Sequence, residues 1–64
     1  MKVKYDKETD VLYINFNDQQ VHESDEDKPG IIIDYAADGH IVGIKLLDAS
    51  KQTAQPSKFE YEVS

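Results

Sequence analysis

The chain has 64 residues, with 13 acidic residues against seven lysines, no arginine and a formal net charge of −6 at pH 7. This length allows one small domain spanning 1–64, and such a chain buries only about 60% of its unfolded surface. The absence of cysteine excludes disulfides and thiolate metal sites, so oligomerisation is the remaining way to complete a core. The acidic balance and the lack of arginine argue against nucleic acid as a partner.

The first predicted element is an N-terminal β-hairpin. Residues 2–6 alternate between polar and apolar side chains, residues 7–10 form a turn, and residues 11–16 are rich in β-branched and aromatic residues typical of a strand. A one-residue shift would scatter the apolar side chains, so the pattern favours the register that pairs Asp6 with Val11. One face then carries Val3, Tyr5, Leu12, Ile14 and Phe16.

A second hairpin follows a polar stretch at 17–29. Residues 31–35 and 41–47 are predicted strands, and the turn between them places Gly39 in the left-handed conformation. Pairing Tyr35 with His40 sets Ile33 opposite Val42 and Ile31 opposite Ile44.

The pattern changes after Leu47. Asp48 can act as the N-cap of a short helical turn within 49–55, which Pro56 ends. Residues 58–63 alternate again and predict a fifth strand at an edge of the sheet. We therefore expect a mainly β protein, a small antiparallel β-meander of four to five strands (two hairpins plus a C-terminal strand) with at most a short helical turn near 49–55.

The two hairpins place eleven large apolar side chains on a surface that we call face one. An exposed patch of this size is unusual for a soluble monomer, and the three apolar side chains of the tail, at 59, 61 and 63, cannot cover it. We therefore predict a homo-oligomer, with a dimer favoured, formed by packing two copies face to face. The tail strand could pair within its own chain or with a neighbouring chain. Face one consists of Val3, Tyr5, Leu12, Ile14, Phe16, Ile31, Ile33, Tyr35, Val42, Ile44 and Leu46, and the predicted interaction residues are Leu12, Ile14, Phe16, Ile33, Val42 and Ile44.

The opposite surface, face two, contains a glycine in the middle of a strand. Gly43 could form the floor of a flat ligand site surrounded by Tyr13, Asp34 and Lys45. The favoured interpretation is structural: Gly43 relieves crowding beneath a packed tail, and Asp34 and Lys45 form a cross-strand ion pair.

The acidic segment 22–27 contains weak candidate metal ligands, namely His22, Glu23, Asp25 and Asp27. Their spacing matches no EF-hand loop, and a solvated acidic loop is the favoured interpretation. His40 directly follows the hairpin turn, where it is expected to cap the turn. No serine or threonine lies in a glycine-flanked elbow or beside an obvious base. We therefore expect neither an enzyme nor a bound cofactor.

Several motifs together resemble a known family. They are the opening segment 1–6, the strands 10–14 and 30–35, the hairpin end 39–44, and the segment 47–51 (LDASK). Over residues 1–51 the chain is similar to the small bacterial and phage proteins of domain-of-unknown-function family 2283. The resemblance implies a small β-meander protein without an established activity, and an antitoxin-like partner role, but it implies no catalytic residues.

The sequence also predicts where the protein works. No apolar run approaches the roughly 20 residues of a membrane span, and no signal-peptide pattern follows Met1. A cysteine-free chain suits a reducing compartment, so we expect a soluble cytoplasmic protein. The favoured function is a non-catalytic, oligomeric interaction module that binds a basic protein. The alternative is binding of a metal or small ligand by the acidic loop 22–27 or by the Gly43 face.

Overall fold

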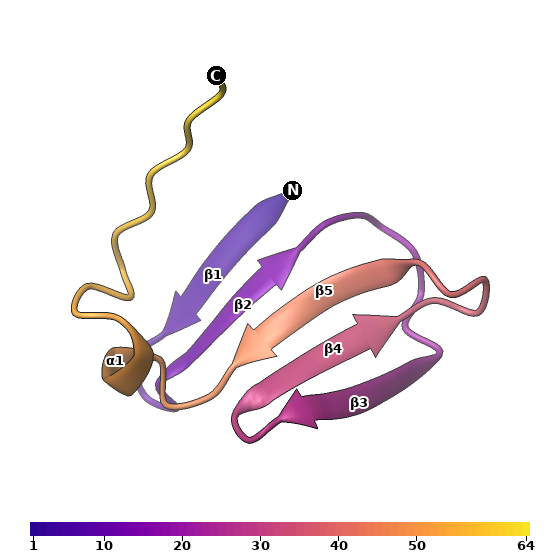
Figure 1. Ribbon diagram of the computed structural model, residues 1–64, viewed down its shortest axis with the longest axis horizontal. Helices are drawn as coiled ribbons and strands as arrows, with labels where there is room; N and C mark the ends of the chain where they lie inside the picture. Colours follow the sequence, from indigo (N-terminus) through magenta and orange to yellow (C-terminus); the bar gives the residue numbers. More distant parts are fainter.

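The computed structural model describes residues 1–64. It contains one five-stranded antiparallel sheet followed by a short helix (Figure 1). The predicted class, a mainly β antiparallel protein with one short helical turn, is confirmed. The elements are β1 (Lys2–Asp6), β2 (Val11–Asn15), β3 (Glu23–Lys28), β4 (Ile31–Tyr35), β5 (Ile41–Leu46) and α1 (Ala49–Gln52).

The strand order is β1-β2-β5-β4-β3, which places β5 at the centre of the sheet. Strands β3, β4 and β5 follow one another as a meander, and the N-terminal hairpin joins them through pairing of β2 with β5. Backbone hydrogen bonds hold both ends of the link between β2 and β3 on the sheet. Phe16 N–H donates to Val42 O at 2.8 Å, and His22 N–H donates to Tyr35 O at 2.7 Å. The two hairpins therefore form one continuous sheet.

The N-terminal hairpin has the predicted register, with Asp6 opposite Val11. In the second hairpin the predicted pairing of Tyr35 with His40 is wrong: Tyr35 lies opposite Ile41, and Ile33 lies opposite Ile44. The cause is a bulge that leaves Val42 as an extra residue between the partners of Asp34 and Tyr35. The partner of Ile33 therefore moves by two residues, which keeps Ile31, Ile33, Ile44 and Leu46 on their predicted face.

The turn of this hairpin has the predicted glycine conformation. Gly39 has φ 90°, a value that side chains with a Cβ rarely adopt. Ala36 N–H donates to His40 O at 2.8 Å, and Gly39 N–H donates to Ala36 O at 3.0 Å. The backbone bonds that close the turn therefore start from Ala36, the residue after the predicted pairing residue Tyr35.

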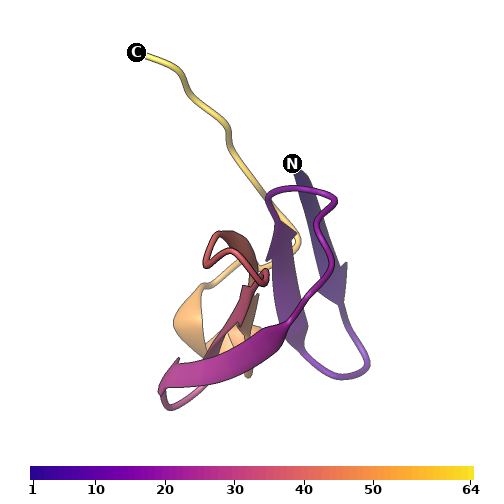
Figure 2. The ribbon, with the colours of Figure 1, turned by 90° about the vertical axis from the view of Figure 1, so that its right-hand side faces the viewer.

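The fifth strand is not the one predicted. Residues 58–63 form no strand, and the tail extends away from the sheet (Figures 1 and 2). The acidic segment, predicted to be a solvated loop, instead forms β3 along the outer edge of β4. Acidic residues have low strand propensity, but charged side chains are common on edge strands because they discourage further pairing. Strand β3 was therefore not predicted, because it lies in the most polar segment of the sequence.

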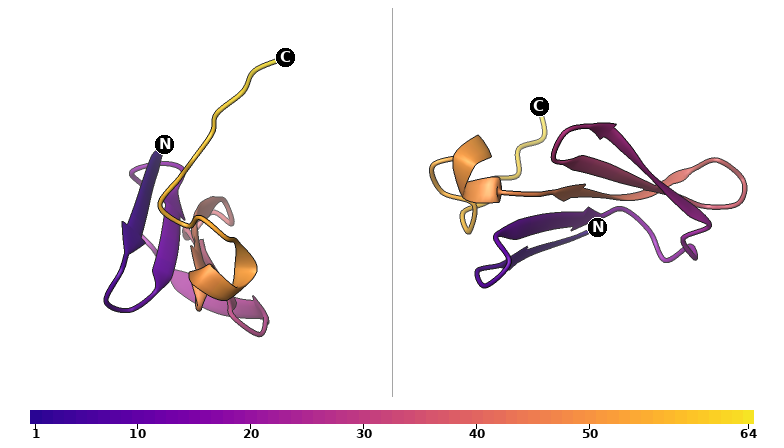
Figure 3. Two further views of the ribbon diagram at one scale, coloured as in Figure 1. Left: turned by 90° about the vertical axis from the view of Figure 1, so that its left-hand side faces the viewer. Right: turned by 90° about the horizontal axis from the view of Figure 1, so that it is seen from below.

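The sheet is strongly twisted, and it buries very little. Figure 2 shows β3 running steeply across the direction of β1, and Figure 3 shows the N-terminal hairpin offset from β3 and β4. Only five of 64 residues are buried, among them Asp34, Val42 and Ala49. No helix has both the length and the apolar character needed to cross a membrane. A single layer of strands therefore leaves most of its apolar side chains only half covered.

Candidate functional site

Face one is a continuous apolar surface on one side of the sheet. The registers align its side chains in two rows that cross four strands. Most of these side chains are half-buried, and Phe16 is 41% exposed. The two rows are Val3–Ile14–Ile44–Ile33 and Tyr5–Leu12–Leu46–Ile31.

The structure brings together four of the six predicted interaction residues on β2, β4 and β5: Leu12, Ile14, Ile33 and Ile44. Phe16 lies just beyond β2 and is exposed. Val42 differs, because at 2% exposure it is already covered within the chain. It therefore contributes to the core and offers no surface to a partner.

Face two carries a hydrogen-bonded cluster around a buried carboxylate. Asp34 is 2% exposed, and its Oδ1 accepts a 2.6 Å bond from Ser24 Oγ. Its Oδ2 accepts a 3.4 Å bond from Tyr13 Oη and lies 3.8 Å from Lys45 Nζ. Because a buried carboxylate is costly unless it is paired, these contacts are what allow Asp34 to sit inside the sheet. They also confirm the predicted ion pair between Asp34 and Lys45.

Gly43 forms the floor of this cluster. A Cβ added to Gly43 would lie 2.6 Å from Tyr13 Oη and 2.8 Å from Ile14 O. The Tyr13 ring therefore covers the glycine, and Lys45 Nζ lies 5.7 Å from the centre of that ring, within cation–π range. The floor of the predicted ligand site is thus filled by Tyr13, and the predicted tail does not pack there.

Ser24 belongs to this cluster but was missed from the sequence. It faces Asp34 because β3 pairs with β4 with Ser24 opposite Asp34. The only available signal was a lone hydroxyl within an acidic run. The role of this hydroxyl can be inferred only when residues 23–28 are known to form a strand beside β4.

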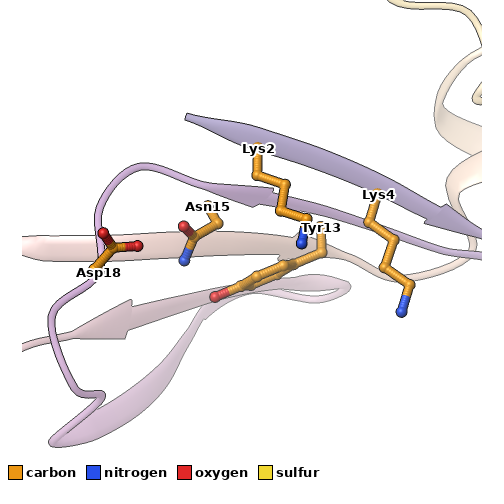
Figure 4. Close-up of a pocket in the computed structure, with 5 residues that line it drawn as sticks. All are labelled: Lys2, Lys4, Tyr13, Asn15 and Asp18. Carbon is orange, nitrogen blue, oxygen red and sulfur yellow. The ribbon is translucent and has the colours of Figure 1, made fainter.

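A shallow pocket of about 440 Å³ lies on face two beside Tyr13. In Figure 4 the lysine side chains of β1 extend on the same side of the sheet as Tyr13. Neither Lys2 nor Lys4 has a carboxylate within ion-pair distance. This acidic protein therefore carries a patch of unpaired positive charge along the outer edge of β1. The pocket is lined by Lys2, Lys4, Tyr13, Asn15 and Asp18. A second hollow, of about 220 Å³, is lined by Gln20, Val21, His22 and Ala37.

The weak candidate metal ligands His22, Glu23, Asp25 and Asp27 lie on β3 or directly before it. No group of three or more histidine, cysteine, aspartate or glutamate side chains is arranged to hold a metal ion. The other histidine has a structural contact, because His40 N–H and Nδ1 lie 3.0 and 2.8 Å from the Asp38 carboxylate. The backbone and ring contacts of His40 hold the pKa of Asp38 at about 2. His40 therefore caps its turn, as predicted.

A second polar cluster attaches α1 to the N-terminal hairpin. Asp48 occupies the N-cap position, but it has φ 50° and its side chain makes no capping bond, so its predicted capping role is wrong. The Asp10 carboxylate takes this role instead, accepting Ser50 N–H at 3.1 Å and Ser50 Oγ–H at 2.6 Å. Tyr5 Oη donates to the same carboxylate at 2.7 Å. The segment 47–50 thus fastens the chain end to the β1–β2 turn.

These hydrogen bonds change the acidity of both partners. The Ser50 hydroxyl, followed by the Tyr5 hydroxyl, stabilises the ionised form and lowers the pKa of Asp10. Donation to the Asp10 carboxylate raises the pKa of Tyr5. At neutral pH, Asp10 is therefore the fixed charge around which this end of the molecule is organised.

The fold and these clusters define a small antiparallel β protein with one open apolar face and a buried polar cluster on the other. The model of the family described as protein of unknown function (DUF2283) matches residues 2–50. The chain therefore belongs to this family, as its motifs suggested. A comparison with curated proteins finds no match, and a comparison with solved structures also finds none.

Substitution of Gly43 tests the packing of Tyr13. We expect Gly43→Ala to lower the free energy of unfolding by about 1–3 kcal/mol, because the new methyl overlaps the Tyr13 ring and Ile14 O. In urea titrations, Gly43→Ala added to a Tyr13→Ala chain should cost clearly less than it does alone, since the ring is then absent. Strict additivity of the two substitutions would contradict the proposed contact.

Titration of Asp10 tests the attachment of α1. Because the folded-state pKa is depressed, the stabilisation is present at neutral pH and is lost as pH falls below about 3.9 and through the lower folded value. In NMR titrations, Ser50→Ala should raise the pKa of Asp10 towards its ordinary value. Thr53→Ala, whose side chain makes no such bond, should leave it unchanged. An unshifted Asp10 in the Ser50→Ala chain would exclude the bond.

Proposed function

We propose that the protein is a non-catalytic interaction module of the cytoplasm that works as a homodimer. Two copies pack through face one, and the dimer presents its acidic surface to a basic partner protein. The observation that carries this proposal is the open apolar face, on which two rows of large side chains cross four strands while only five residues of the chain are buried. Patches of this kind mark interaction surfaces in soluble proteins.

A second copy is the occupant that best fits face one. The surface is apolar across β1, β2, β5 and β4, and charge enters it along the β3 edge, where Glu23 and Asp25 lie opposite Tyr35 and Ile33. A sheet face of this kind is what β-sandwiches complete by packing a second sheet against it. A 64-residue chain also has little other means of burying enough apolar area. The dimer therefore supplies the missing half of the core.

The acidic edge supports a basic partner. Strand β3 lies at one edge of the sheet and is exposed along its whole length. Its charges, together with a net charge of −6, would speed encounter with a basic protein and disfavour acidic competitors. An antitoxin-like role fits this charge distribution.

One feature supports a role without catalysis. Asp34, the one buried carboxylate, is fully engaged by Ser24, Tyr13 and Lys45, and an acid or base for catalysis needs access to a substrate. The ligand-binding alternative is less well supported, because Tyr13 covers Gly43. The interaction role uses the surfaces that remain open.

Neighbouring isoleucines of β4 provide a matched test of the dimer. The wild-type chain, of 7.3 kDa, should have twice this mass by light scattering at micromolar concentration. Ile33→Lys on face one should give a monomer, because a buried interface does not accept an unpaired charge. Ile32→Lys on face two should leave the dimer intact.

The milder Ile33→Thr covers the case in which the lysine variant fails to fold, and it should weaken the dimer while circular dichroism retains the strand signal. A folded wild-type monomer at this concentration would refute the dimer.

The basic partner is tested by co-purification from the native host at low and high salt. A partner held by the β3 edge should be released by salt. Recovery should also fall when Glu26, which lies on face two opposite Ile32, is changed to lysine, whereas the same change at Glu8, in the β1–β2 turn, should retain the partner. Equal recovery with all three baits would rule out the β3 edge as the contact.

A further inference from the structure

The C-terminal tail has a pattern that the isolated chain does not use. Residues 58–63 alternate between charged and apolar side chains, and the apolar ones are exposed: Phe59 by 52%, Tyr61 by 72% and Val63 by 77%. Figure 1 shows the tail leaving α1 and passing outside β1 without joining it. Such alternation is typical of a strand with one buried face. The tail therefore lacks a partner strand in this structure.

The sheet has two edges, and their charges differ. Strand β3 carries four acidic residues and would repel the acidic side chains at 60 and 62. Strand β1 carries Lys2 and Lys4, which have no ion-pair partner and line the pocket of Figure 4. Only the β1 edge is complementary to the tail.

One antiparallel register matches the tail to β1 at every position. With Glu60 opposite Lys4, all the charged pairs on face two are of opposite sign, and all the pairs on face one are apolar. A shift of two residues either way introduces a like-charge pair, Lys58 with Lys4 or Glu60 with Asp6, which is destabilising. A shift of one residue sets apolar against charged side chains. The matched pairs are Glu62–Lys2, Glu60–Lys4, Lys58–Asp6, Tyr61–Val3 and Phe59–Tyr5.

A strand added by the tail would enlarge the surface that face one offers to a second copy. The four strands that carry its apolar rows, at a spacing of about 4.8 Å and each about 17 Å long, give a flat footprint of roughly 330 Å². A standard interface buries about 800 Å² of accessible surface per partner, and each added strand widens the contact. Three further apolar side chains and six more residues of paired backbone would extend the contact towards that size.

We propose that the tail of each copy adds as a strand to the β1 edge of a second copy, with Glu60 and Glu62 on Lys4 and Lys2. The proposal deepens, and rests on, the dimer proposed above. Exchange is favoured over pairing within one chain because the tail diverges from the sheet of its own chain (Figures 2 and 3). Reciprocal exchange also closes as a two-fold dimer.

Two oppositely altered chains test the exchange. Chain one carries Lys2→Glu and Lys4→Glu, so its β1 edge and its tail are both acidic. Chain two carries Glu60→Lys and Glu62→Lys, so its edge and tail are both basic. In hydrogen-exchange measurements, the amides of residues 58–63 should be protected in the wild type. In each altered chain alone they should exchange on the order of tenfold faster.

Mixing the two chains separates exchange between copies from pairing within a copy. In a mixed dimer each tail meets an edge of opposite charge, so tail protection should return, and native mass measurement of one isotope-labelled chain should show the heterodimer. Pairing within a chain would gain nothing from mixing. A chain with Lys7→Glu and Lys28→Glu has the same charge change as chain one, away from both elements, and should keep a protected tail.

Three results would overturn the exchange. The first is no recovery of protection on mixing, and the second is an unprotected tail in a wild-type dimer. The third is a protected tail in the monomeric Ile33→Lys chain, which would indicate pairing within one copy. The mass of the wild-type protein decides the dimer independently, so a failure of the tail proposal and a failure of the dimer can be told apart.

Discussion

The constraint on which the whole structure depends is that one sheet has two faces, and 64 residues cannot cover both. On face two the chain solves the problem locally. Tyr13 lies over Gly43, and Ser24 and Lys45 satisfy the Asp34 carboxylate, which leaves a small polar core. On face one no comparable cluster forms and the tail extends away, so its large apolar side chains stay only partly buried. Assembly is the remaining way to remove that surface from water.

Two polar clusters stabilise this single-layered fold at different places. The cluster around Asp34 ties β2, β3, β4 and β5 together across face two. The cluster around Asp10 fastens α1 to the β1–β2 turn and so fixes the point from which the tail departs. Directional hydrogen bonds specify position in a protein whose apolar contacts are too few to do so.

The sequence predicted the strands whose hydrophobic pattern is strong, and it failed where local preference and tertiary context disagree. The register of β1 with β2 follows from apolar alternation alone, whereas the partner of Ile33 depends on a bulge at Val42 that no pattern reveals. Strand β3 was missed because its residues are poor strand formers that pair only with β4 beside them. Tyr13, Asp34 and Lys45 were correctly grouped around Gly43, but Ser24, and the bond of Ser50 to Asp10, join residues from separate elements and required the fold itself.

The central claim, that face one is completed by a second copy, is tested most directly by the dependence of stability on protein concentration. Folding coupled to dimerisation makes the midpoint of urea unfolding rise with concentration, because dilution favours the separated chains. We predict such a rise for the wild-type protein, with circular dichroism and sedimentation reporting the same transition. A midpoint that stays constant over a hundredfold range of concentration, for a chain that remains folded, would contradict the account.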